Sequence, residues 1–563
     1  MRVTIISGGS GNDALMSGLL KLYPIIDISV ITNAYDDGKS TGVCRKITNT
    51  LGVSDIRKNH FRMYWLKSKN KDNRLKEFYT SRYDLPKGDE RKFVAKKLID
   101  LGLNHLVQWS NRFFDLCDKD STYDFSDFNI ANIVYSAMYS SMGYENTNAF
   151  FCKMLNIDDF VILNSYDNMR LWALTANNLP LCSEGEIVDY NNTDPIKAVY
   201  YNGDDNYTLN QKAIDAVNNA DMIIISAGTF WSSIFPTLQY HDFYKIINNS
   251  KARKMWVINN EYDKDAIDVT SNNLIDIISE LGLKLNDWTI ITNNDAHENL
   301  RLTHSVYKTV SGNLGNINGK HSPELLAQFV LRQYYNLDDN YDSILVDFDD
   351  TIWSRLALSN EQHLAVSLSN IVSINSPEFV IVSGNNYPCI YDKIRRAIGD
   401  TTRFNASIWC DASTNEYKND VVIDSIESSL IDEDRAHNIC SYIKSTFGIN
   451  CTLNHKEKIS CLKIKPLGSL ERDILVVVIN KYVLPALGEK KLIAIKTGKT
   501  TIDIIAKDND KARILTKLGL DEKKTLFIGD ECILGNDKEI SSRTTHFINV
   551  ENVFETNLIL KLL

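Results

Sequence analysis

Proline, paired cysteines and long apolar runs are all scarce in this chain of 563 residues, and each scarcity argues against a class of protein. With only 10 prolines and 44% hydrophobic residues, extensive disorder is not expected. The 10 cysteines form no CxxC pair and no cluster with histidine, which argues against a zinc site and favours reduced thiols. Since no apolar run approaches the roughly 20 residues that cross a bilayer, no membrane anchor is expected.

An excess of positive charge is also missing. Lys and Arg number 62 against 72 Asp and Glu, and the net charge of −10 argues against a broad nucleic-acid or membrane surface. A local basic pocket for phosphate stays compatible with this balance. The charge favours a protein that acts on small molecules. Because residues 1–6 lead straight into a strand pattern, we expect no targeting segment and a cytoplasmic protein. The sequence leaves the oligomeric state open, a homo-oligomer included.

Two large domains are expected, because a single hydrophobic core stops growing near about 250 to 300 residues. In the first half of the chain, short apolar runs alternate with amphipathic stretches, which predicts a mostly parallel sheet covered by helices. The predicted strands cover residues 2–6, 26–32, 159–163, 222–226, 254–258 and 288–292. Between the second and third of them, a polar, aromatic-rich stretch that includes residues 128–138 predicts an inserted helical layer.

A second alternating series follows the polar stretch at residues 336–341, which predicts the domain boundary. We therefore expect domains at residues 1–335 and 342–563. Strands of the second domain are predicted at 343–347, 379–382, 524–528 and 546–550, and an inserted α+β module at about 388–506 with strands near 459–464, 492–496 and 501–505. The predicted fold class is α/β, with two Rossmann-like parallel sheets.

Two carboxylates stand two positions apart at the end of the first strand of the second domain. Asp347 and Asp349 can both approach one phosphoryl group and one metal ion, and Mg²⁺ would offset the repulsion between the anions. Asp347 is expected to be the nucleophile that forms an aspartyl phosphate. Asp349 is expected to protonate the leaving oxygen and then to activate water. Taken alone, the same residues fit a solvated acidic turn.

Three further segments, each after a predicted strand or at a helix start, supply the other groups that this chemistry needs. Ser383, in Ser383-Gly384-Asn385, offers a hydroxyl beside backbone amides, and Lys511 can balance the charge of the phosphate and the nucleophile. Gly529-Asp530 brings one more carboxylate to the end of a strand. The predicted metal ligands are Asp347, Asp349 and Asp530, with Asn536 and Asp537 as further ligands or supports.

These four segments, in this order, resemble the haloacid dehalogenase superfamily of phosphatases and phosphomutases, across essentially the whole second domain. Residues 527–537 look most like the sugar-phosphate branch, which includes phosphomannomutases and sucrose-phosphatase-like enzymes. The resemblance implies that the module at 388–506 is a cap that closes over the substrate and selects it. The second motif departs from the common pattern, because Asn385 stands where many members have arginine.

A glycine-rich loop joins the first predicted strand to a helix. There, flexible glycines and free amides can cradle a phosphate, and the predicted contacts are Gly9, Ser10, Gly11 and Asn12. Asp36 and Asp37 follow the second strand, where an acid that binds a metal or a ribose would stand. Any tight strand-to-helix turn favours glycine, so the loop by itself is weak evidence.

Residues 33–42, 54–59 and 226–236 strengthen this interpretation. Over about residues 1–310 they resemble the family that contains 2-phospho-L-lactate transferase and the bacterial gluconeogenesis factor. The resemblance implies a site for a phosphate-containing, nucleotide-linked ligand, at which hydroxyls bind phosphate and an arginine neutralises it. The residues expected to contribute are Ser40, Arg57, Asn132, Gly228, Thr229, Ser232 and Ser233. Each also fits a plainer role as a turn, an ion pair or a helix cap.

The leading hypothesis is a bifunctional enzyme, in which the first domain transfers a phosphate-containing group from a nucleotide-linked donor and the second hydrolyses a phosphomonoester. One alternative makes the first domain a nucleotide-sugar sensor that regulates the phosphatase, and another makes the second domain a phosphomutase. A dinucleotide oxidoreductase is the least favoured, because the sequence offers no clear hydride-transfer constellation. The expected partner is a small phosphorylated substrate, with no nucleic acid and no membrane.

Overall fold

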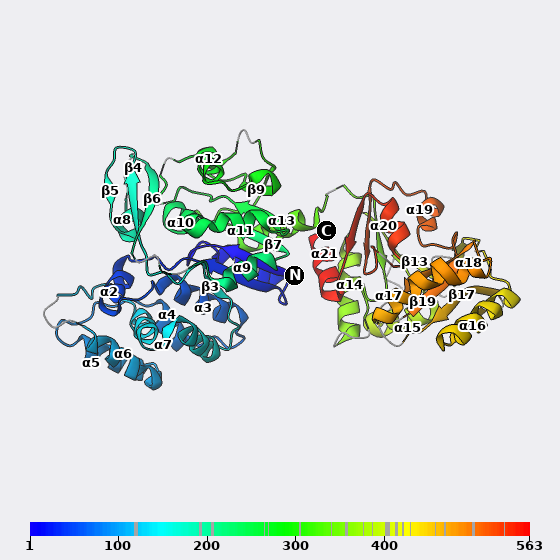
Figure 1. Cartoon of the computed structure of the whole chain (residues 1–563), viewed down its shortest axis with the longest axis horizontal. Helices are drawn as coiled ribbons and strands as arrows, with labels where there is room; N and C mark the ends of the chain where they lie inside the picture. The colour runs from blue at the N-terminus through cyan, green and yellow to red at the C-terminus, as the bar shows by residue number, and fades with distance from the viewer. Residues whose placement is uncertain are drawn as a thin grey trace. The chain divides into compact units, whose positions relative to one another are not determined.

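The computed structural model describes most of the chain in two compact units, Met1–Tyr334 and Tyr335–Leu563 (Figure 1). The described residues are 1–117, 122–190, 194–203, 206, 208–263, 265–267, 269–302, 306–338, 340–354, 359–374, 377–385, 387–399, 406–410, 415–418, 421–427, 429–456, 458–466, 469–497, 501–533 and 535–563. Among them, every helix is too short or too polar to pass through a lipid bilayer.

The first unit is built on a seven-stranded parallel sheet in the order β10-β9-β8-β7-β1-β2-β3. Its strands are β1 (Arg2–Ile6), β2 (Asp27–Thr32), β3 (Val161–Leu163), β7 (Met222–Ile225), β8 (Arg253–Val257), β9 (Trp288–Asn293) and β10 (Thr309–Gly312). Because helices cover both faces, strands such as β7 read as continuous buried apolar runs. The predicted α/β class is confirmed, and β10 is an additional strand.

Helices between β2 and β3 form the layer expected there. They are α2 (Lys39–Thr48), α3 (Ser54–Lys67), α4 (Asn73–Thr80), α5 (Glu90–Asp100), η1 (Asn104–Leu106), α6 (Val107–Asp115) and α7 (Ile130–Leu155). Helices α2, α3, α4 and α6 pack against α7, whose first half is almost fully buried. Helix α7 is kinked at Gly143, which has φ 79°.

The remaining helices of the first unit connect the strands of the large sheet. They are α1 (Asp13–Leu22), α9 (Gln211–Asn218), η2 (Phe230–Ile234), α10 (Phe235–Gln239), η3 (Tyr240–Asp242), α11 (Phe243–Asn249), α12 (Ser271–Leu281), η4 (Leu285–Asp287), η5 (Glu298–Leu300) and α13 (Pro323–Tyr335). A small antiparallel sheet, β5-β4-β6, follows β3 and was not predicted from the sequence. Its elements are β4 (Arg170–Thr175), β5 (Pro180–Leu181), α8 (Glu184–Val188) and β6 (Ile196–Asn202).

The second unit has a seven-stranded sheet in the order β15-β14-β13-β12-β11-β20-β21. The parallel strands are β11 (Ser343–Asp347), β12 (Glu378–Val382), β13 (Ser407–Cys410), β20 (Thr525–Gly529) and β21 (His546–Asn549). The antiparallel strands β14 (Asn415–Lys418) and β15 (Val421–Ser425) extend this sheet at one edge. Its helices are α14 (Asn360–Ser373), α15 (Tyr387–Ile398), α19 (Arg513–Leu518), α20 (Lys538–Arg543) and α21 (Val553–Leu562).

A module at residues 431–506, hereafter the cap, has a separate core. Its antiparallel sheet, β16-β17-β19-β18, comprises β16 (Cys451–Lys456), β17 (Lys458–Ile464), β18 (Leu492–Thr497) and β19 (Thr501–Ala506). The sheet packs against α16 (Glu433–Phe447), α17 (Ser469–Val478), η7 (Ile479–Val483) and α18 (Leu484–Ala486). The range expected for the insertion began near residue 388, whereas the structure places α15, β13, β14 and β15 with the main sheet.

The two ends of the cap are tied together. The amide of Ser429 donates to Oδ1 of Asn509 at 3.0 Å, and Nδ2 of Asn509 donates to the carbonyl of Ser429 at 2.6 Å. The chain therefore leaves the main sheet and returns to it at one place.

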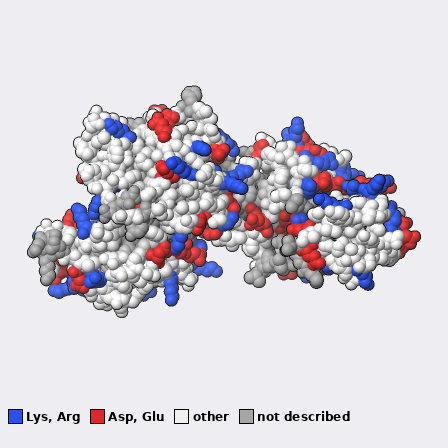
Figure 2. All heavy atoms as spheres, in the orientation of Figure 1, with Lys and Arg blue, Asp and Glu red and all other residues white. Residues whose placement is uncertain are grey.

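Acidic and basic side chains of the described residues are interspersed on the face shown in Figure 2, and among them neither sign gathers into one broad patch. This distribution agrees with the modest net charge of −10.

Candidate active sites

Three carboxylates meet at the carboxyl ends of β11 and β20. Asp347 is the last residue of β11, Asp530 directly follows β20, and Asp537 precedes α20. Each offers a carboxylate oxygen, and these atoms lie within 4.8 Å of one another. The parallel register of β11 and β20 explains the meeting, because neighbouring parallel strands end at the same edge of the sheet.

Lys511 lies among these carboxylates and is almost fully buried. Its Nζ donates to Asp347 and, at 2.5 Å, to Oδ1 of Asp537. Burial alone would lower the pKa of Lys511, but the two carboxylates raise it above its ordinary value. The lysine is therefore charged and holds the carboxylate of Asp347 in one orientation.

One lysine does not balance three acidic groups. Burial, together with the nearby Asp537, raises the pKa of Asp530 to about 8. The adjacent Asn536 has a buried side-chain oxygen, Oδ1, without a hydrogen-bond partner among the described residues. Several carboxylate oxygens close together, beside an amide oxygen that accepts no hydrogen bond, are the ligands that a hard divalent cation prefers. These residues therefore fit Mg²⁺.

Asp349 belongs to a second set of contacts and is not part of the three-carboxylate group. Its Oδ2 accepts hydrogen bonds from Ser383 Oγ at 3.1 Å and Asn385 Nδ2 at 2.7 Å. Its Oδ1 accepts from Lys393 Nζ at 3.0 Å, and this ammonium lies 3.6 Å from the ring centroid of Trp353. Lys393 and Trp353 were not singled out from the sequence, because their places on α15 and in the loop after β11 follow no motif.

In the first unit, the glycine loop after β1 is closely packed against two other loops. A Cβ on Gly9 would lie 2.2 Å from Oδ1 of Asp55, at the start of α3. A Cβ on Gly11 would lie 1.9 Å from the carbonyl oxygen of Ala227, in the loop after β7. Ser10 is exposed at the tip, while Asn12 is fully buried and donates to Asn59 at 3.0 Å.

Asp36 and Asp37 follow β2 and face different partners. Asp36 accepts from the Gly38 amide at 3.0 Å and from Thr41 Oγ1 at 3.2 Å. The side chain of Asp37 is 2% exposed and accepts from the amide of Gly185, at the start of α8, at 3.2 Å. Burial raises the pKa of Asp37, although the Gly185 amide opposes this shift.

Glu184 brings a further carboxylate to this place. Burial and the charges of Asp36, Asp55 and Asp37 raise the pKa of Glu184 well above its ordinary value. Its role was missed because it lies in the small antiparallel sheet region, about 147 residues after Asp37, where the sequence carries no recognisable motif.

Arg45 was also missed. It binds the backbone of the loop that carries Asp36 and Asp37. It is 1% exposed, and its guanidinium donates to the carbonyls of Tyr35 at 2.9 Å and Met169 at 2.6 Å. Burial lowers the pKa of Arg45 to about 10.

Arg57, Asn132 and Ser40 form one buried network. Arg57 Nε donates to Asn132 Oδ1 at 2.8 Å, and Asn132 Nδ2 donates to Ser40 Oγ at 3.0 Å. Arg57 also donates to the carbonyl of Tyr79, and burial lowers its pKa to about 10. In this arrangement the three predicted residues join α2, α3 and α7, and Arg57 is 5% exposed.

The predicted hydroxyls after β7 lie together at the start of η2. Thr229 Oγ1 lies 2.8 Å from Ser233 Oγ and accepts from Ser232 Oγ at 2.8 Å. The amides at this helix start are already bound, because Asp265 accepts from Phe230 at 3.2 Å and Ser232 at 2.8 Å. A phosphate here would therefore meet hydroxyls rather than those two amides.

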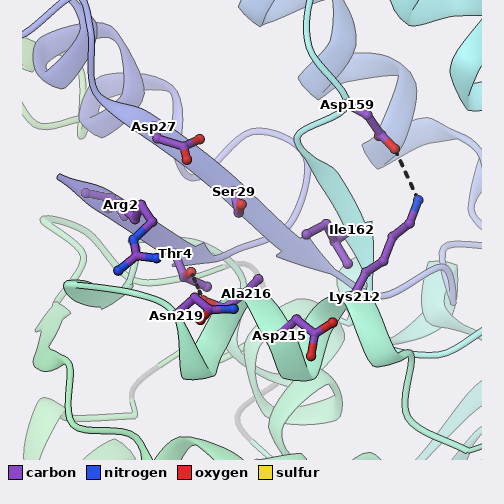
Figure 3. Close-up of a pocket in the computed structure, with 11 residues that line it drawn as sticks. Arg2, Thr4, Asp27, Ser29, Asp159, Ile162, Lys212, Asp215, Ala216 and Asn219 are labelled. Atoms are coloured by element: carbon purple, nitrogen blue, oxygen red, sulfur yellow. Dashed lines mark hydrogen bonds and ion pairs between the residues drawn. The ribbon is translucent and has the colours of Figure 1, made fainter.

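A separate cavity of about 320 Å³ lies at the opposite, amino ends of β1, β2 and β3 (Figure 3). Its charged side chains are partly paired with one another, as in the contact of Lys212 with Asp159 at 3.4 Å. The predicted phosphate-binding residues of the first unit do not line it.

The profile of the family described as 2-phospho-L-lactate transferase CofD matches residues 3–313. The match covers more than half of the 563 residues, so the chain belongs to this family. The resemblance inferred from residues 33–42, 54–59 and 226–236 is thus confirmed.

Two relatives have a related description. A putative gluconeogenesis factor of Thermoanaerobacterium thermosulfurigenes is 25% identical over 299 residues, 52% of this chain and 78% of the relative. The gluconeogenesis factor of Listeria innocua is 24% identical over 267 residues, 46% of this chain and 66% of the relative.

Two solved structures are each similar to part of the chain. A Bacillus halodurans protein is 18% identical with a TM-score of 0.45, covering 59% of this chain and 99% of that protein. The IMP-bound IMP-nucleotidase of Plasmodium falciparum is 16% identical with a TM-score of 0.33, covering 43% of this chain and 72% of that protein.

Because the loops after β1 and β7 are in contact, we expect alanine substitutions at Gly11 and Gly228 to differ in their effect on stability. Gly11→Ala places a Cβ against backbone, and we expect it to destabilise the first unit by roughly 1–3 kcal/mol. Gly228→Ala is the matched control, because its Cβ would meet its nearest atom, the Cα of Gly11, at an ordinary 3.8 Å. Thermal unfolding of both variants tests this, and equal melting temperatures would contradict it.

The carboxylate crowding predicts how stability depends on pH when divalent cations are removed. The pKa of Asp530 is about 8 in the folded protein, against an ordinary 3.8 in the unfolded chain. The folded state therefore binds the Asp530 proton more tightly than the unfolded chain does. The free energy of unfolding gains from this proton below about pH 4 and loses that gain as the pH rises to about 8. We expect hydrogen exchange of β20 in EDTA to show this loss and Mg²⁺ at pH 8 to reverse it. Asp530→Asn should flatten the dependence; an unchanged profile in that variant would exclude the assignment.

Proposed function

We propose that the second unit is a Mg²⁺-dependent phosphomonoester hydrolase. The observation that carries this proposal is the buried contact of Lys511 with Asp347 and Asp537, beside Asp530, at the carboxyl end of a parallel sheet. A lysine that fixes one carboxylate among other acidic groups orients a nucleophile and leaves the group able to accept a cation.

In the proposed reaction, Asp347 and Asp349 have different roles. A carboxylate oxygen of Asp347 attacks phosphorus, the ester P–O bond breaks, and the leaving alcohol takes a proton from Asp349. Water, deprotonated by Asp349, then attacks the aspartyl phosphate and releases inorganic phosphate and the Asp347 carboxylate. Ser383, Asn385 and Lys393 hold Asp349 while it takes and gives this proton.

Mg²⁺, when bound by Asp347, Asp530 and Asp537, would supply the positive charge that lets a phosphate dianion approach these carboxylates. Lys511 supplies part of that charge from the protein itself.

For the first unit we propose transfer of a phosphate-containing group from a nucleotide-linked donor. The family description supports this reaction class, and the loops after β1, β2 and β7 gather glycines, carboxylates and hydroxyls at one sheet edge. Such donors and acceptors are small molecules, so neither a nucleic acid nor a membrane is needed as a partner. The two activities would act in one pathway on related phosphorylated compounds.

A regulatory first unit is the second candidate. The two relatives described above are named gluconeogenesis factors, a name that states no transfer reaction. In this reading, the unit binds a nucleotide sugar without turnover and alters the rate of the phosphatase.

Asp347→Asn tests the hydrolase. Because the amide retains the size of the carboxylate but is a poor nucleophile, we expect phosphate release to fall by at least about a thousandfold without loss of the fold. Phosphate release from sugar phosphates, nucleotides and phospho-acids is measured with Mg²⁺ and with EDTA. Hydrolysis that persists in the variant would place the nucleophile elsewhere, and an isomeric phosphate ester as product would indicate a phosphomutase.

Asp36→Asn tests the first unit in the full chain that also carries Asp347→Asn, so that hydrolysis does not obscure transfer. We expect weaker binding of nucleoside-diphosphate-linked donors, by roughly tenfold, because the variant loses a charge at the ligand edge. Asp27→Asn is the matched control, since Asp27 lies at the amino end of the same strand. Product formation supports transfer; binding without turnover supports regulation. Equal binding by both variants would move the site away from Asp36.

A further inference from the structure

The phosphohydrolase site needs more positive charge than Lys511 supplies. The ammonium of Lys511 is shared between the carboxylates of Asp347 and Asp537. A bound phosphate monoester brings about two further negative charges at neutral pH. A second cation close to the nucleophile would offset part of this charge, and the ammonium of Lys393 on α15 is in contact with Asp349.

Lys393 is a buried ammonium that has donors to spare. Its side chain is 10% exposed, and its Nζ donates to Oδ1 of Asp349 at 3.0 Å. Among the residues that the structure describes, Asp349 is the only hydrogen-bond acceptor of this ammonium. The ring centroid of Trp353 lies 3.6 Å away, a cation–π contact that holds the group in place. Because an ammonium has three donors and a buried unmatched donor is costly, a further acceptor beside Lys393 would bind favourably.

The position of Asp349 places this ammonium at the reacting centre. Asp349 stands two residues after Asp347; burial raises the pKa of Asp347, and the nearby charge of Asp349 adds to this rise. In the proposed reaction, Asp349 gives its proton to the leaving oxygen, so its carboxylate comes within one hydrogen-bond length of that oxygen. Nζ of Lys393, one hydrogen bond beyond the carboxylate, then lies on the order of 7 Å from the leaving oxygen. The flexible four-carbon side chain of lysine can reach the phosphoryl oxygens over this distance.

We propose that Lys393 donates a hydrogen bond to a phosphoryl oxygen of the bound phosphate group, in addition to holding Asp349. The inference rests on the proposed hydrolase function. It gives the two buried lysines different tasks, since Lys511 orients Asp347 and Lys393 neutralises the incoming phosphate. The same contact would bind inorganic phosphate, the product of the reaction.

Binding of inorganic phosphate, measured by calorimetry on the full chain with Mg²⁺, separates this contact from a role in holding Asp349 alone. Asp349→Asn removes the carboxylate and frees the ammonium, so we expect this variant to bind phosphate several-fold more tightly than the native chain. Adding Lys393→Met should then raise the Kd at least about tenfold, because a charge-assisted hydrogen bond is lost. Arg395→Met, which removes an exposed cation of the same helix, is the matched control and should leave the Kd unchanged.

Asn385 offers a rescue of activity. It donates to Oδ2 of the carboxylate whose Oδ1 binds Lys393, so Asn385→Arg brings a guanidinium to the other oxygen of Asp349. We expect Lys393→Met to lower kcat/KM for phosphate esters by at least about a hundredfold, and Asn385→Arg in that background to recover roughly tenfold. A lysine with a packing role alone would not be replaced by an arginine at another position.

The outcomes separate this inference from the hydrolase itself. If Asp349→Asn binds phosphate no more tightly than the native chain, if adding Lys393→Met leaves its Kd unchanged, or if Asn385→Arg restores nothing, the phosphate contact is overturned. In each of these cases the hydrolase stands as long as phosphate release depends on Asp347. Hydrolysis that does not depend on Asp347 would overturn the hydrolase and this inference together.

Discussion

The parallel pairing of strands is the constraint on which both candidate sites depend. In the first unit β1 lies between β2 and β7, and in the second β11 lies between β12 and β20. Each central strand is buried on both faces, so its interior is mostly apolar and its charged groups gather at the ends. Segments far apart in the sequence therefore meet at one edge: Gly11 packs against Gly228, and Asp347 lies beside Asp530. The residues of each candidate site therefore come from separate segments that meet at this edge, and not from one continuous motif.

Apolar runs made the large sheets predictable, because a strand covered on both faces must be hydrophobic throughout. All six predicted strands of the first unit and all four of the main sheet in the second are present. The strands that escaped prediction are β10, β13, the β14–β15 hairpin, β16 and the β4–β6 sheet. β13 has only four residues, and β4, β6, β10 and β15 are partly or fully exposed, so these strands are hard to tell from loops. The same difficulty made the expected insertion begin too early.

The structure brings Asp347, Asp530 and Lys511 together, as expected for residues that follow a strand or start a helix. The supporting side chains were not predicted. Lys393, Arg45 and Glu184 reach their sites from helices and from a distant small sheet, and only tertiary packing brings them there. Sequence reasoning also assigned Arg57 to a ligand, whereas its contacts are those of a buried link between helices. A motif shows which residues lie at a strand end. It does not show which of their side chains already bind other parts of the protein.

The joined ends of the cap have a consequence for how this half of the chain can diversify. Ser429 and Asn509 bind each other, so the 79 residues between them form an insertion whose two ends lie together beside the main sheet. Replacing this insertion with another whose ends lie equally close together leaves the order and pairing of the parallel strands unchanged. The cap and the carboxylate group are thereby encoded in separable stretches of sequence, and one can drift or be exchanged while the other is kept.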